Sequence, residues 1–544
     1  MIWLTKKDLE HTEPAEVAAF RSPIPTQMVS NGEFMPAHQT RAQRQVEEQI
    51  KALADRFGGQ LGLSRRKFMQ TSCGMAAAFL AMNSVYGSVF AVDPAEAADP
   101  GAAAARLKGL AHQFVFDDQV HFVRDDFTRE QVLRLAEYAK NWNPVLKEQK
   151  ITLQRYKFEN FVKEVFMDSD TKVALLSGAP FDDIEGWFLS NDQMARARAL
   201  INDLAGSRRL LCHSLVLPGQ PRWVEEVERA ISDLKPDGWK GYTIGDPSNP
   251  ASKYPWRLDD EKLMYPVYEK MVKSGILNVS IHKGLLPPNY EKSFSNVWRY
   301  ATVEDLGKAA KDWPQLNFIM YHAAHRPFLE APDQSLGDFE KTGRINWVSE
   351  LADIPGKHGV SNVYGELGTT FANSAVTNPR YCAALLGTLI KGLGADHVVW
   401  GTDSVWYGSP QWQIEAFRRL EIPDDMQKKY GFAPLGAADG MVKNAVLGYN
   451  SARLYSLNLR ATRLPLPADH PDRLARMKAE YELGGAARPK PHPPRLARDP
   501  CFSGRRRRGF EGMSRSSSSN TSLTKQCLTA ACGRPPRVKR QATA

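Results

Sequence analysis

The stretch Asn317-Phe-Ile-Met-Tyr-His322 is an apolar run that ends in a histidine; two other stretches of the chain end in the same way, and a third ends in an aspartate. They are Gln113-Phe-Val-Phe-Asp-Asp-Gln-Val-His121, Ile276-Leu-Asn-Val-Ser-Ile-His282 and His397-Val-Val-Trp-Gly-Thr-Asp403. Short apolar runs of this kind predict strands that are buried in a parallel sheet. In an α/β barrel the carboxyl ends of the strands open into the site, so the four terminal side chains are expected to meet there.

Further strand-like segments alternate with helical patterns along the chain. We predict strands at 113–118, 172–177, 210–216, 238–244, 276–281, 317–321, 361–366 and 397–402. Segment 259–275 is typical of the helices between them, with acids in its first turn and a glycine at its end. Eight strands that alternate with helices predict a (β/α)8 TIM barrel with insertions. A doubly wound open sheet is the alternative, but it needs a phosphate-binding glycine loop after an early strand, and the sequence has none of that form.

Composition and charge limit the classes of function. The chain has 544 residues, 42% of them hydrophobic, which is enough for a sizeable core. The net charge is +10, but the residues from Arg488 onward carry 14 Lys and Arg against 2 acids, which leaves −2 for the rest. The body of the protein is therefore not expected to bind nucleic acid specifically. The six cysteines form no CxxC pair, which argues against a zinc knuckle or a disulfide scaffold.

An export signal is predicted near the amino terminus. Ser64-Arg-Arg-Lys-Phe-Met69 precedes a modestly apolar, Ala-rich stretch, and Ala95-Glu-Ala97 has the small-x-small form of a cleavage site. This pattern resembles a twin-arginine signal, which implies export of an already folded protein to the periplasm or the outside of the cell, with the twin-arginine machinery as a partner. A single membrane anchor is the alternative. Residues 1–63 exceed an ordinary signal n-region, so either a later start codon or a long leader is compatible with the sequence.

The sequence therefore predicts three parts: a leader at 1–97, expected to be disordered apart from a helical pattern at 41–56, a barrel at 110–460, and a basic tail at 466–544. The tail is rich in Pro, Arg and Ser and cannot bury enough apolar surface to offset its ordering entropy, so we expect it to be disordered. Its Arg-rich runs could bind an anionic surface, or they could simply be solvated.

The four strand-end residues suggest a metal site. Imidazole and carboxylate are good donors to zinc and related divalent ions, and a catalytic site needs about three protein ligands and an open position. His121, His282 and Asp403 can supply these three ligands. His322 is then free to act as a general acid or base, because the unperturbed pKa of imidazole lies near neutrality.

The chain resembles the amidohydrolase-related family of metal-dependent hydrolases, particularly the branch that includes aminocarboxymuconate-semialdehyde-type decarboxylases. The resemblance covers about residues 110–457. It lies in Asp117-x-x-x-His121, His282, Tyr321-His322, Gly401-Thr-Asp403-Ser and the terminal Asn450-Ser-Ala-Arg-Leu454 helix. It implies a barrel with one divalent ion, often zinc, held by histidines and Asp403, and a small-molecule substrate. Barrels of this family are often homodimers.

One position departs from the family pattern. The first strand of the family carries Asp-x-His-x-His, whereas this chain has Gln119 in place of the first histidine. An amide oxygen is a weaker and harder donor than imidazole. The site is therefore looser, prefers a harder ion, or holds no ion. Asp118 is not expected to compensate, because alternation along a strand points it away from Asp117, Gln119 and His121.

Several other side chains are candidates for substrate binding. Lys240 lies in a predicted strand, Arg326 follows His322 and could pair with a carboxylate, and Trp406 follows Asp403. Lys240 could also form a carbamate, or be a structural lysine. His325, next to Arg326, could help to hold the same carboxylate. Glu366 and Tyr407 are expected near the pocket wall, and His213 within a strand is expected to be structural.

Three functions stay open at this point. The first is a metal-dependent hydrolase of a small carboxylated or cyclic substrate, with His322 and Asp403 as its catalytic groups. The second is a non-oxidative metal-dependent decarboxylase, which would use the same residues. The third is an exported binding protein without activity, which the glutamine at position 119 makes plausible.

Overall fold

A barrel of eight parallel strands forms the centre of the protein. The computed structural model describes residues 22–26, 39–129, 152–183, 186–287, 289–326, 332–406, 408–458 and 473–483. Within them the strands follow the chain in the order β1 to β8, each paired with the next. They are β1 (Phe116–Val120), β2 (Val173–Leu176), β3 (Leu210–Leu215), β4 (Gly238–Tyr242), β5 (Asn278–His282), β6 (Asn317–Tyr321), β7 (Val363–Glu366) and β8 (Val398–Val399). The predicted TIM barrel and its eight strands are confirmed.

The last strand returns to the first. Val120 forms an isolated parallel bridge with Ser404. The backbone amide of Asp403 donates to the carbonyl of Gln119 at 2.9 Å, and the amide of Asp118 donates to the carbonyl of Trp400 at 2.8 Å. These bonds bring the ends of β1 and β8 side by side, although they lie almost 300 residues apart in the sequence.

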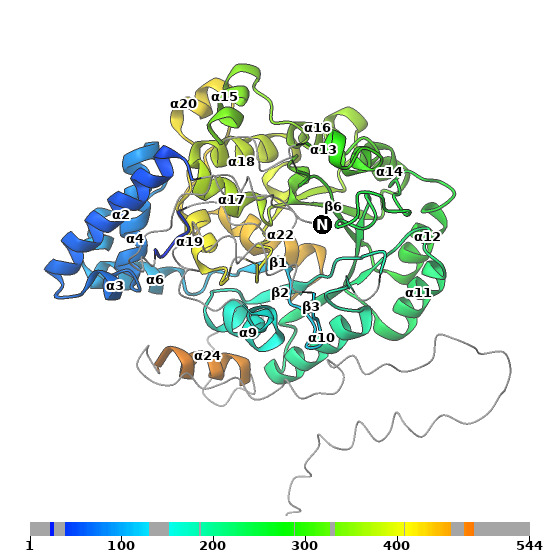
Figure 1. Cartoon of the computed structure of the whole chain (residues 1–544), viewed down its shortest axis with the longest axis horizontal. Coiled ribbons are helices and arrows are strands. Elements are labelled where there is room, and N and C mark those ends of the chain that lie inside the picture. Colours follow the sequence, from blue (N-terminus) through cyan, green and yellow to red (C-terminus); the bar gives the residue numbers. More distant parts are fainter. Residues whose placement is uncertain are drawn as a thin grey trace, which may run out of the picture. The chain divides into compact units, whose positions relative to one another are not determined.

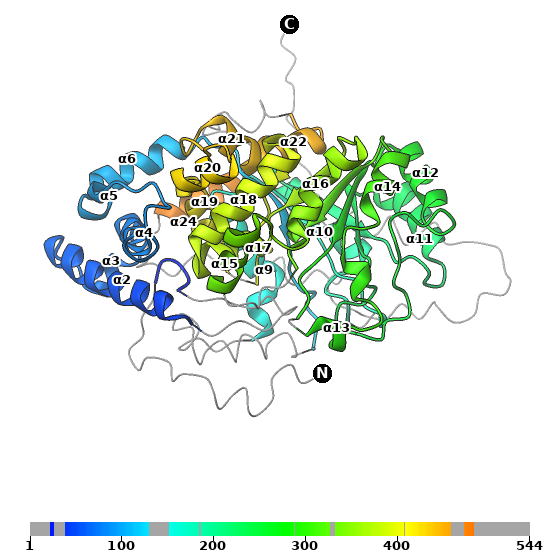
Figure 2. The ribbon, with the colours of Figure 1, turned by 90° about the horizontal axis from the view of Figure 1, so that it is seen from above.

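Helices surround the strands (Figures 1 and 2). Those between β2 and the end of the barrel are α10 (Asn191–Ala205), α11 (Trp223–Arg229), α12 (Tyr265–Ser274), α13 (Tyr290–Ser293), α14 (Leu306–Asp312), α15 (Pro332–Thr342), α16 (Val348–His358), α17 (Thr370–Thr377), α18 (Pro379–Leu393), α19 (Gln411–Arg419), α20 (Asp424–Tyr430), α21 (Met441–Asn444) and α22 (Asn450–Leu454). Before β2 lies α9 (Phe158–Val162), which continues as a π-helical turn, Lys163–Met167.

Local signals explain where these helices begin and end. A capping box formed by Ser190 and Gln193 starts α10, and a left-handed Gly206 ends it. Segment 259–275 was predicted as one helix, but α12 begins only at Tyr265. The carboxylate of Asp260 accepts hydrogen bonds from the backbone amides of Lys262 and Leu263, which holds the preceding residues in a turn.

The closing helical segment is anchored to β8. It runs through α21, a π-helical turn at Ala445–Tyr449 and α22. The side-chain amide of Asn450 donates to the carbonyls of Ala395 and Val398, both at 2.8 Å. The helix therefore closes the barrel at the start of its last strand.

The predicted leader is helical over much of its length, and the expectation of disorder is wrong for residues 41–98. It forms α2 (Arg41–Gln60), α3 (Arg65–Phe68), α4 (Ser72–Tyr86) and α5 (Pro94–Ala98), and α6 (Pro100–Leu110) follows. The predicted helix at 41–56 is confirmed as part of α2. The apolar residues of α4 belong to the same hydrophobic core as the outer helices of the barrel. Sequence composition alone could not predict this packing, because an Ala-rich helix is equally suited to a signal peptide and to a helix interface.

A helix also occurs within the predicted tail. Helix α24 (Arg473–Leu483) places Leu474 in a core cluster with residues of α9 and α10, and Lys478 and Tyr481 hydrogen-bond to Ser169 and Asp168. The expectation of disorder is therefore wrong for residues 473–483, and the rest of the predicted tail lies outside the described residues. No helix in the described ranges is long and apolar enough to cross a membrane.

Candidate active site

The site begins at β1, where the strand loses its regular register. Phe116 and Asp117 pair with Val173 and Ala174 of β2, but the next pair is Val120 with Leu176, so β1 carries an extra residue between Asp117 and Val120. A β-bulge of this kind redirects side chains at a barrel rim. It lies at the two positions, Asp118 and Gln119, on which the metal hypothesis depends.

Asp117 fixes the bulged strand to the end of β8. Its carboxylate accepts hydrogen bonds from the hydroxyl and the backbone amide of Thr402 and from the amide of Gln119. Burial raises the pKa of Asp117 to about 7, partly offset by the hydrogen bonds from Thr402. Asp117 therefore holds Thr402 and, with it, the following Asp403.

Gln119, His121 and Asp403 form a compact trio. His121 Nε2 lies 2.9 Å from Asp403 Oδ1. The side-chain nitrogen of Gln119 lies 3.0 Å from the same oxygen and 3.2 Å from His121 Nε2. All three residues are buried. Burial acts to raise the pKa of Asp403, but the hydrogen bond and the charge of His121 outweigh it, so that this pKa is lowered.

Neighbouring groups fix the orientation of His121. Its Nδ1 lies 2.8 Å from the carbonyl oxygen of Ser177, so Nδ1 carries the proton and Nε2 faces Asp403. The hydroxyl of Ser177 lies 3.1 Å from Nδ1 of His213. His213 is thus a structural residue behind His121, as expected. The ring of Trp406 stacks on that of His121, with centroids 5.6 Å apart.

His282 and His322 form a second group. His322 Nδ1 lies 2.9 Å from the carbonyl oxygen of Gly368, so this nitrogen donates and Nε2 accepts. Nε2 lies 3.1 Å from His282 Nδ1, which is then the donor and leaves His282 Nε2 as its lone-pair atom. Burial lowers the pKa of His322 to about 4, against the opposing charge of Asp403, and burial also lowers the pKa of His282 well below its ordinary value. Both imidazoles are therefore neutral at neutral pH.

The segment after β7 connects the two groups, and the sequence analysis overlooked most of it. Glu366 accepts hydrogen bonds from the backbone amides of His322 and Gly368. Thr369 donates its hydroxyl hydrogen to Asp403 Oδ2. The strand-end rule that selected the histidines would also have selected this segment, because it follows the carboxyl end of a strand.

Unusual backbone conformations gather at the same rim. His322, Ala323 and Ala324 have φ of 62°, 50° and 54°, and Thr369 and Asp403 have φ of 58° and 59°. Residues other than glycine rarely adopt positive φ, and such conformations are concentrated at functional sites. Five of the ten non-glycine residues with positive φ in the described part of the chain thus lie at the rim of β6 to β8, which marks it as a candidate site.

The remaining candidates lie at different depths. Lys240 is buried in the barrel, with its Nζ 3.4 Å from the ring centroid of Tyr321, and its charge lowers the raised pKa of Asp118. Asp118 thus interacts with Lys240 instead of the trio. The guanidinium of Arg326 lies over the ring of Tyr290 and 3.6 Å from Glu291. The substrate-binding roles of Lys240, Arg326 and Trp406 stay predictions.

Two other candidates can be placed only in part. His325 contacts the hydroxyl of Tyr381 at 2.7 Å, away from the trio. Tyr407 lies outside the described residues.

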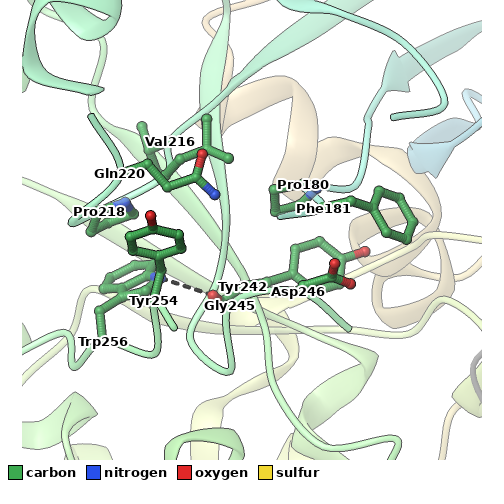
Figure 3. Close-up of a pocket in the computed structure, with 11 residues that line it drawn as sticks. Pro180, Phe181, Val216, Pro218, Gln220, Tyr242, Gly245, Asp246, Tyr254 and Trp256 are labelled. Atoms are coloured by element: carbon green, nitrogen blue, oxygen red, sulfur yellow. Dashed lines mark hydrogen bonds between the residues drawn. The ribbon is translucent and has the colours of Figure 1, made fainter. Parts of the chain in front are cut away.

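A pocket lies beside His282 of the second group, and Figure 3 shows the residues that line it. Its cavity volume is only about 10 Å³, and its walls include Phe181, Tyr242, Tyr254 and Trp256. The indole nitrogen of Trp256 donates to the carbonyl of Tyr242 at 2.8 Å, drawn as the dashed line in Figure 3. The Tyr242 ring stacks on that of His282, with centroids 4.4 Å apart. The aromatic pocket and the histidine pair therefore share a wall.

The pocket has one charged lining residue, Asp246, which is already bonded. Its carboxylate accepts from the backbone amide of Asp182 at 2.9 Å and from the amide and the hydroxyl of Ser248 at 2.7 Å each. Asp246 therefore holds two loops together, and the aromatic rings provide most of the surface that a ligand would contact.

The donor atoms fit a divalent ion in part. Adjacent ligands of a six-coordinate ion with bonds of about 2.1 Å lie about 3 Å apart, which is the spacing of His121 Nε2 and Asp403 Oδ1. Among the residues that the structure describes, no three His, Cys, Asp or Glu side chains form a group that could hold a metal. The predicted ligand His282 therefore belongs to no such group here, and its role stays a prediction.

Comparison with known proteins agrees with the fold. Residues 188–457 match an amidohydrolase family model. The match includes His282, His322 and Asp403 and begins after β1 and β2, so that Gln119 and His121 lie outside it. No curated protein matches the chain.

Similar solved structures include several decarboxylases. One is 5-carboxyvanillate decarboxylase from Sphingomonas paucimobilis, at 17% identity and a TM-score of 0.35, covering 64% of this chain and 100% of that one. Another is 2,6-dihydroxybenzoate decarboxylase from Rhizobium, at 13% identity and a TM-score of 0.38, covering 63% and 99%. A third is a dihydroxybenzoic acid decarboxylase from Polaromonas sp. JS666 with bound manganese and 2-nitroresorcinol, at 13% identity and a TM-score of 0.40, covering 65% and 100%.

Proposed function

We propose that this protein is a metal-dependent, non-oxidative decarboxylase of a small planar carboxylic acid. The observation that carries the proposal is the buried trio at the strand ends, with His121 Nε2 and Asp403 Oδ1 at ligand spacing. The two residues would hold a divalent ion, with His282 as a further predicted ligand. When bound, the ion would supply Lewis acidity that stabilises the negative charge of the reacting group.

The state of Asp403 favours decarboxylation over a hydrolysis in which Asp403 is the base. A hydrolase of this kind needs a carboxylate or an imidazole to take the proton of an attacking water. Both oxygens of Asp403 are engaged, Oδ1 with His121 and Gln119 and Oδ2 with Thr369. Decarboxylation needs no water nucleophile, so it makes no such demand on Asp403.

Burial of the site favours the same reaction. The side chains of the trio, the histidine pair and Glu366 are each at most 4% exposed. Loss of carbon dioxide converts a carboxylate into a neutral molecule and a delocalised carbanion, and exclusion of water destabilises the localised charge more than the delocalised one. The aromatic side chains beside His282 could pack against a planar ring or an unsaturated chain if the pocket widens beyond its present size.

The histidine pair can handle the proton. As the carbon–carbon bond breaks, its electron pair stays on the substrate carbon, which then takes one proton. An anionic substrate raises the pKa of His322, because it adds negative charge to a buried site. Once the hydrogen bond from His282 Nδ1 is released, His322 Nε2 can hold that proton and deliver it to carbon.

A hydrolase is the second candidate, because the family model that matches is described as amidohydrolase. The purified protein, supplied with Mn²⁺ or Zn²⁺, should release carbon dioxide from aromatic or conjugated carboxylic acids. The same protein is assayed with lactones, esters and amides. Turnover of the lactones, esters or amides alone would favour the hydrolase hypothesis over the decarboxylase hypothesis. Binding of compounds from either panel without turnover would support a non-catalytic protein.

A matched pair of variants tests the role of His322. His322→Gln should retain the ion and lose turnover. His325→Gln alters a buried histidine three residues away, which contacts Tyr381 instead of the trio, and should retain both. Equal turnover in the two variants would remove His322 from the mechanism.

We also propose export by the twin-arginine route, on the motif at Arg65 and Arg66. The joint change Arg65→Lys and Arg66→Lys should keep the protein in the cytoplasm, as measured by cell fractionation. Undiminished export of this variant would contradict the proposal.

A further inference from the structure

We infer that Gln119 is a metal ligand whose side-chain amide turns over when the ion binds, and that it shifts the preference of the site towards a hard ion. This inference rests on the proposed metal-dependent function. It gives Gln119 two roles: without an ion its NH₂ group donates to Asp403, and with an ion its oxygen becomes a ligand.

The first observation is the misfit of the amide in the present orientation. The side-chain nitrogen of Gln119 lies 3.0 Å from Asp403 Oδ1 and 3.2 Å from His121 Nε2. The amide oxygen has no hydrogen-bond partner, although the residue is only 1% exposed. An unpaired buried carbonyl oxygen is costly, and each such group in a folded protein calls for an explanation.

The second observation is the surroundings of that oxygen. It lies 2.2 Å from the point where a Cβ on Gly368 would stand, and Glu366 Oε1 lies 2.6 Å from the same point. Only a glycine leaves room here for both oxygens. Both oxygens thus border the space that Gly368 leaves open, and no hydrogen bond to the Gln119 oxygen satisfies it.

A half-turn of the amide removes this conflict and completes a ligand set. The turn exchanges the oxygen and the nitrogen, which occupy nearly equivalent positions. The NH₂ group then faces Glu366, an acceptor. The oxygen then joins His121 Nε2 and Asp403 Oδ1, and the three separations are 2.9, 3.0 and 3.2 Å. Three adjacent ligands of one six-coordinate ion have this spacing, about 3 Å for bonds of about 2.1 Å.

A cation between the three acceptors favours the turned orientation, because without it the Gln119 oxygen would be repelled by the lone pairs of the other two atoms. Without an ion, the present orientation is preferred, because the NH₂ group of Gln119 then donates to Asp403 Oδ1. With two oxygens and one nitrogen, the set is harder than a His-His-Asp set and favours Mn²⁺ or Mg²⁺ more than such a set does.

Metal affinity tests the inference without recourse to turnover. Equilibrium dialysis with Mn²⁺ and with Zn²⁺ is carried out on the wild-type protein, Gln119→Leu and Gln119→His. Gln119→Leu should weaken Mn²⁺ binding by at least about 10- to 100-fold, the loss typical of removing even a supporting residue. Gln119→His should raise the ratio of Zn²⁺ to Mn²⁺ affinity by about tenfold or more.

The control is Gln413→Leu. Gln413 is also fully buried, with an unpartnered amide oxygen, but its amide donates to the carbonyl of Thr402 and does not contact the trio. Its Mn²⁺ affinity should equal that of the wild type. If Gln119→Leu does not fold, Gln119→Glu replaces it and should bind Mn²⁺ more tightly, because a charged oxygen replaces a neutral one.

The outcomes separate the two proposals. Equal Mn²⁺ affinity in the wild type and Gln119→Leu overturns the role of Gln119 and leaves the metal-dependent function standing. A wild-type protein that binds neither ion overturns both. If that ion-free protein nevertheless releases carbon dioxide, the proposed reaction is correct and the proposed requirement for a metal is wrong.

A separate observation concerns the segment that resembles an export signal. We further infer that residues 39–110 stay in the mature protein as a permanent part of its fold. Ala76, Ala77 and Ala78 of α4 are fully buried, and Phe79 is 1% exposed, in a core shared with the outer helices of the barrel.

Specific contacts join this segment to the barrel. The hydroxyl of Tyr86 donates to the carbonyl of Thr377 at 3.0 Å, and the backbone amide of Ala91 donates to the carbonyl of Arg419 at 2.7 Å. Glu96 pairs with Arg419 at 2.5 Å, and Ala97 is fully buried in α5. The small-x-small stretch is therefore helical and packed, whereas a signal peptidase needs an extended and accessible strand.

The test is the mass of the protein recovered from the cell envelope, together with a cut in the full chain. A site for a specific protease is placed at the exposed residues Ala111 and His112. After cleavage the amino-terminal part should co-elute with the barrel in gel filtration, and stay bound until the barrel unfolds. An envelope protein that begins after Ala97, or a fragment that separates while the barrel keeps its urea midpoint, would overturn the inference.

Discussion

The hydrogen bond from Thr369 to Asp403 allows a sharp test of the site. Thr369→Val keeps the β-branched shape of the side chain and removes only the hydroxyl donor to Asp403 Oδ2. The carboxylate is 1% exposed, so water cannot replace the lost donor. A hydrogen bond to a charged group contributes about 1.5–3 kcal/mol, and each 1.4 kcal/mol is about tenfold in an equilibrium constant.

The assay compares this variant with Thr388→Val. Thr388 lies in α18, where its hydroxyl donates to the neutral carbonyl of Ala384 at 2.8 Å. That bond should contribute about 0.5–1.5 kcal/mol, measured as the change in urea unfolding free energy. Thr369→Val should lose more stability than Thr388→Val, and kcat/KM should fall at least about tenfold, because Asp403 is then free to turn. Equal losses in both variants, with unchanged kcat/KM, would refute the claim that Thr369 holds Asp403 in a working orientation.

Three further predictions concern stability and the pocket. Burial lowers the pKa of His325 to about 4 from an ordinary 6.5, so acidification from pH 6.5 to 4 protonates it in the unfolded chain only and destabilises the fold. Over that interval the unfolding free energy of His325→Gln should rise relative to the wild type by up to about 3 kcal/mol, and a constant difference across urea titrations would contradict this. Tyr254→Ala should raise KM for an aromatic carboxylic acid by about two- to tenfold at unchanged kcat, because a stacked ring pair contributes about 0.5–1.5 kcal/mol; an equal rise for an aliphatic acid would argue against ring stacking. Leu474→Ala should lower the free energy of unfolding by about 2–5 kcal/mol, because the side chain of Leu474 in α24 is 1% exposed. A chain ending at Arg488 should have the same free energy of unfolding as the full chain. Equal urea midpoints for Leu474→Ala and the wild type would show that α24 does not stabilise the barrel.

The sequence by itself determined the barrel and the residues at its rim. Strand periods and helix caps are local, and they depend on a few neighbouring residues. The runs ending in His121, His282 and His322 therefore predicted both the strands and the positions of the side chains. The rule that functional groups follow the carboxyl ends of parallel strands then predicted that these side chains lie at one rim of the barrel.

The tertiary structure decided how these residues are grouped. Gln119 and Asp403 are 284 positions apart, and their contact exists only because β8 returns to β1. The bulge in β1, the amide of Gly368 against Glu366 and the hydroxyl of Thr369 likewise depend on that closure. Closure also separated the predicted ligands, since His282 pairs with His322 while His121 pairs with Asp403.

The amino-terminal segment shows the same division. An Ala-rich helix after two arginines is compatible with a signal and with a packed element, because its composition meets the requirements of both. Only the complementary surface of the barrel distinguishes them, since Phe79 of α4 packs under the guanidinium of Arg419, more than 300 residues away. Local sequence thus specified the helices and strands. Which of their side chains come into contact was decided by packing against residues that are distant in the sequence.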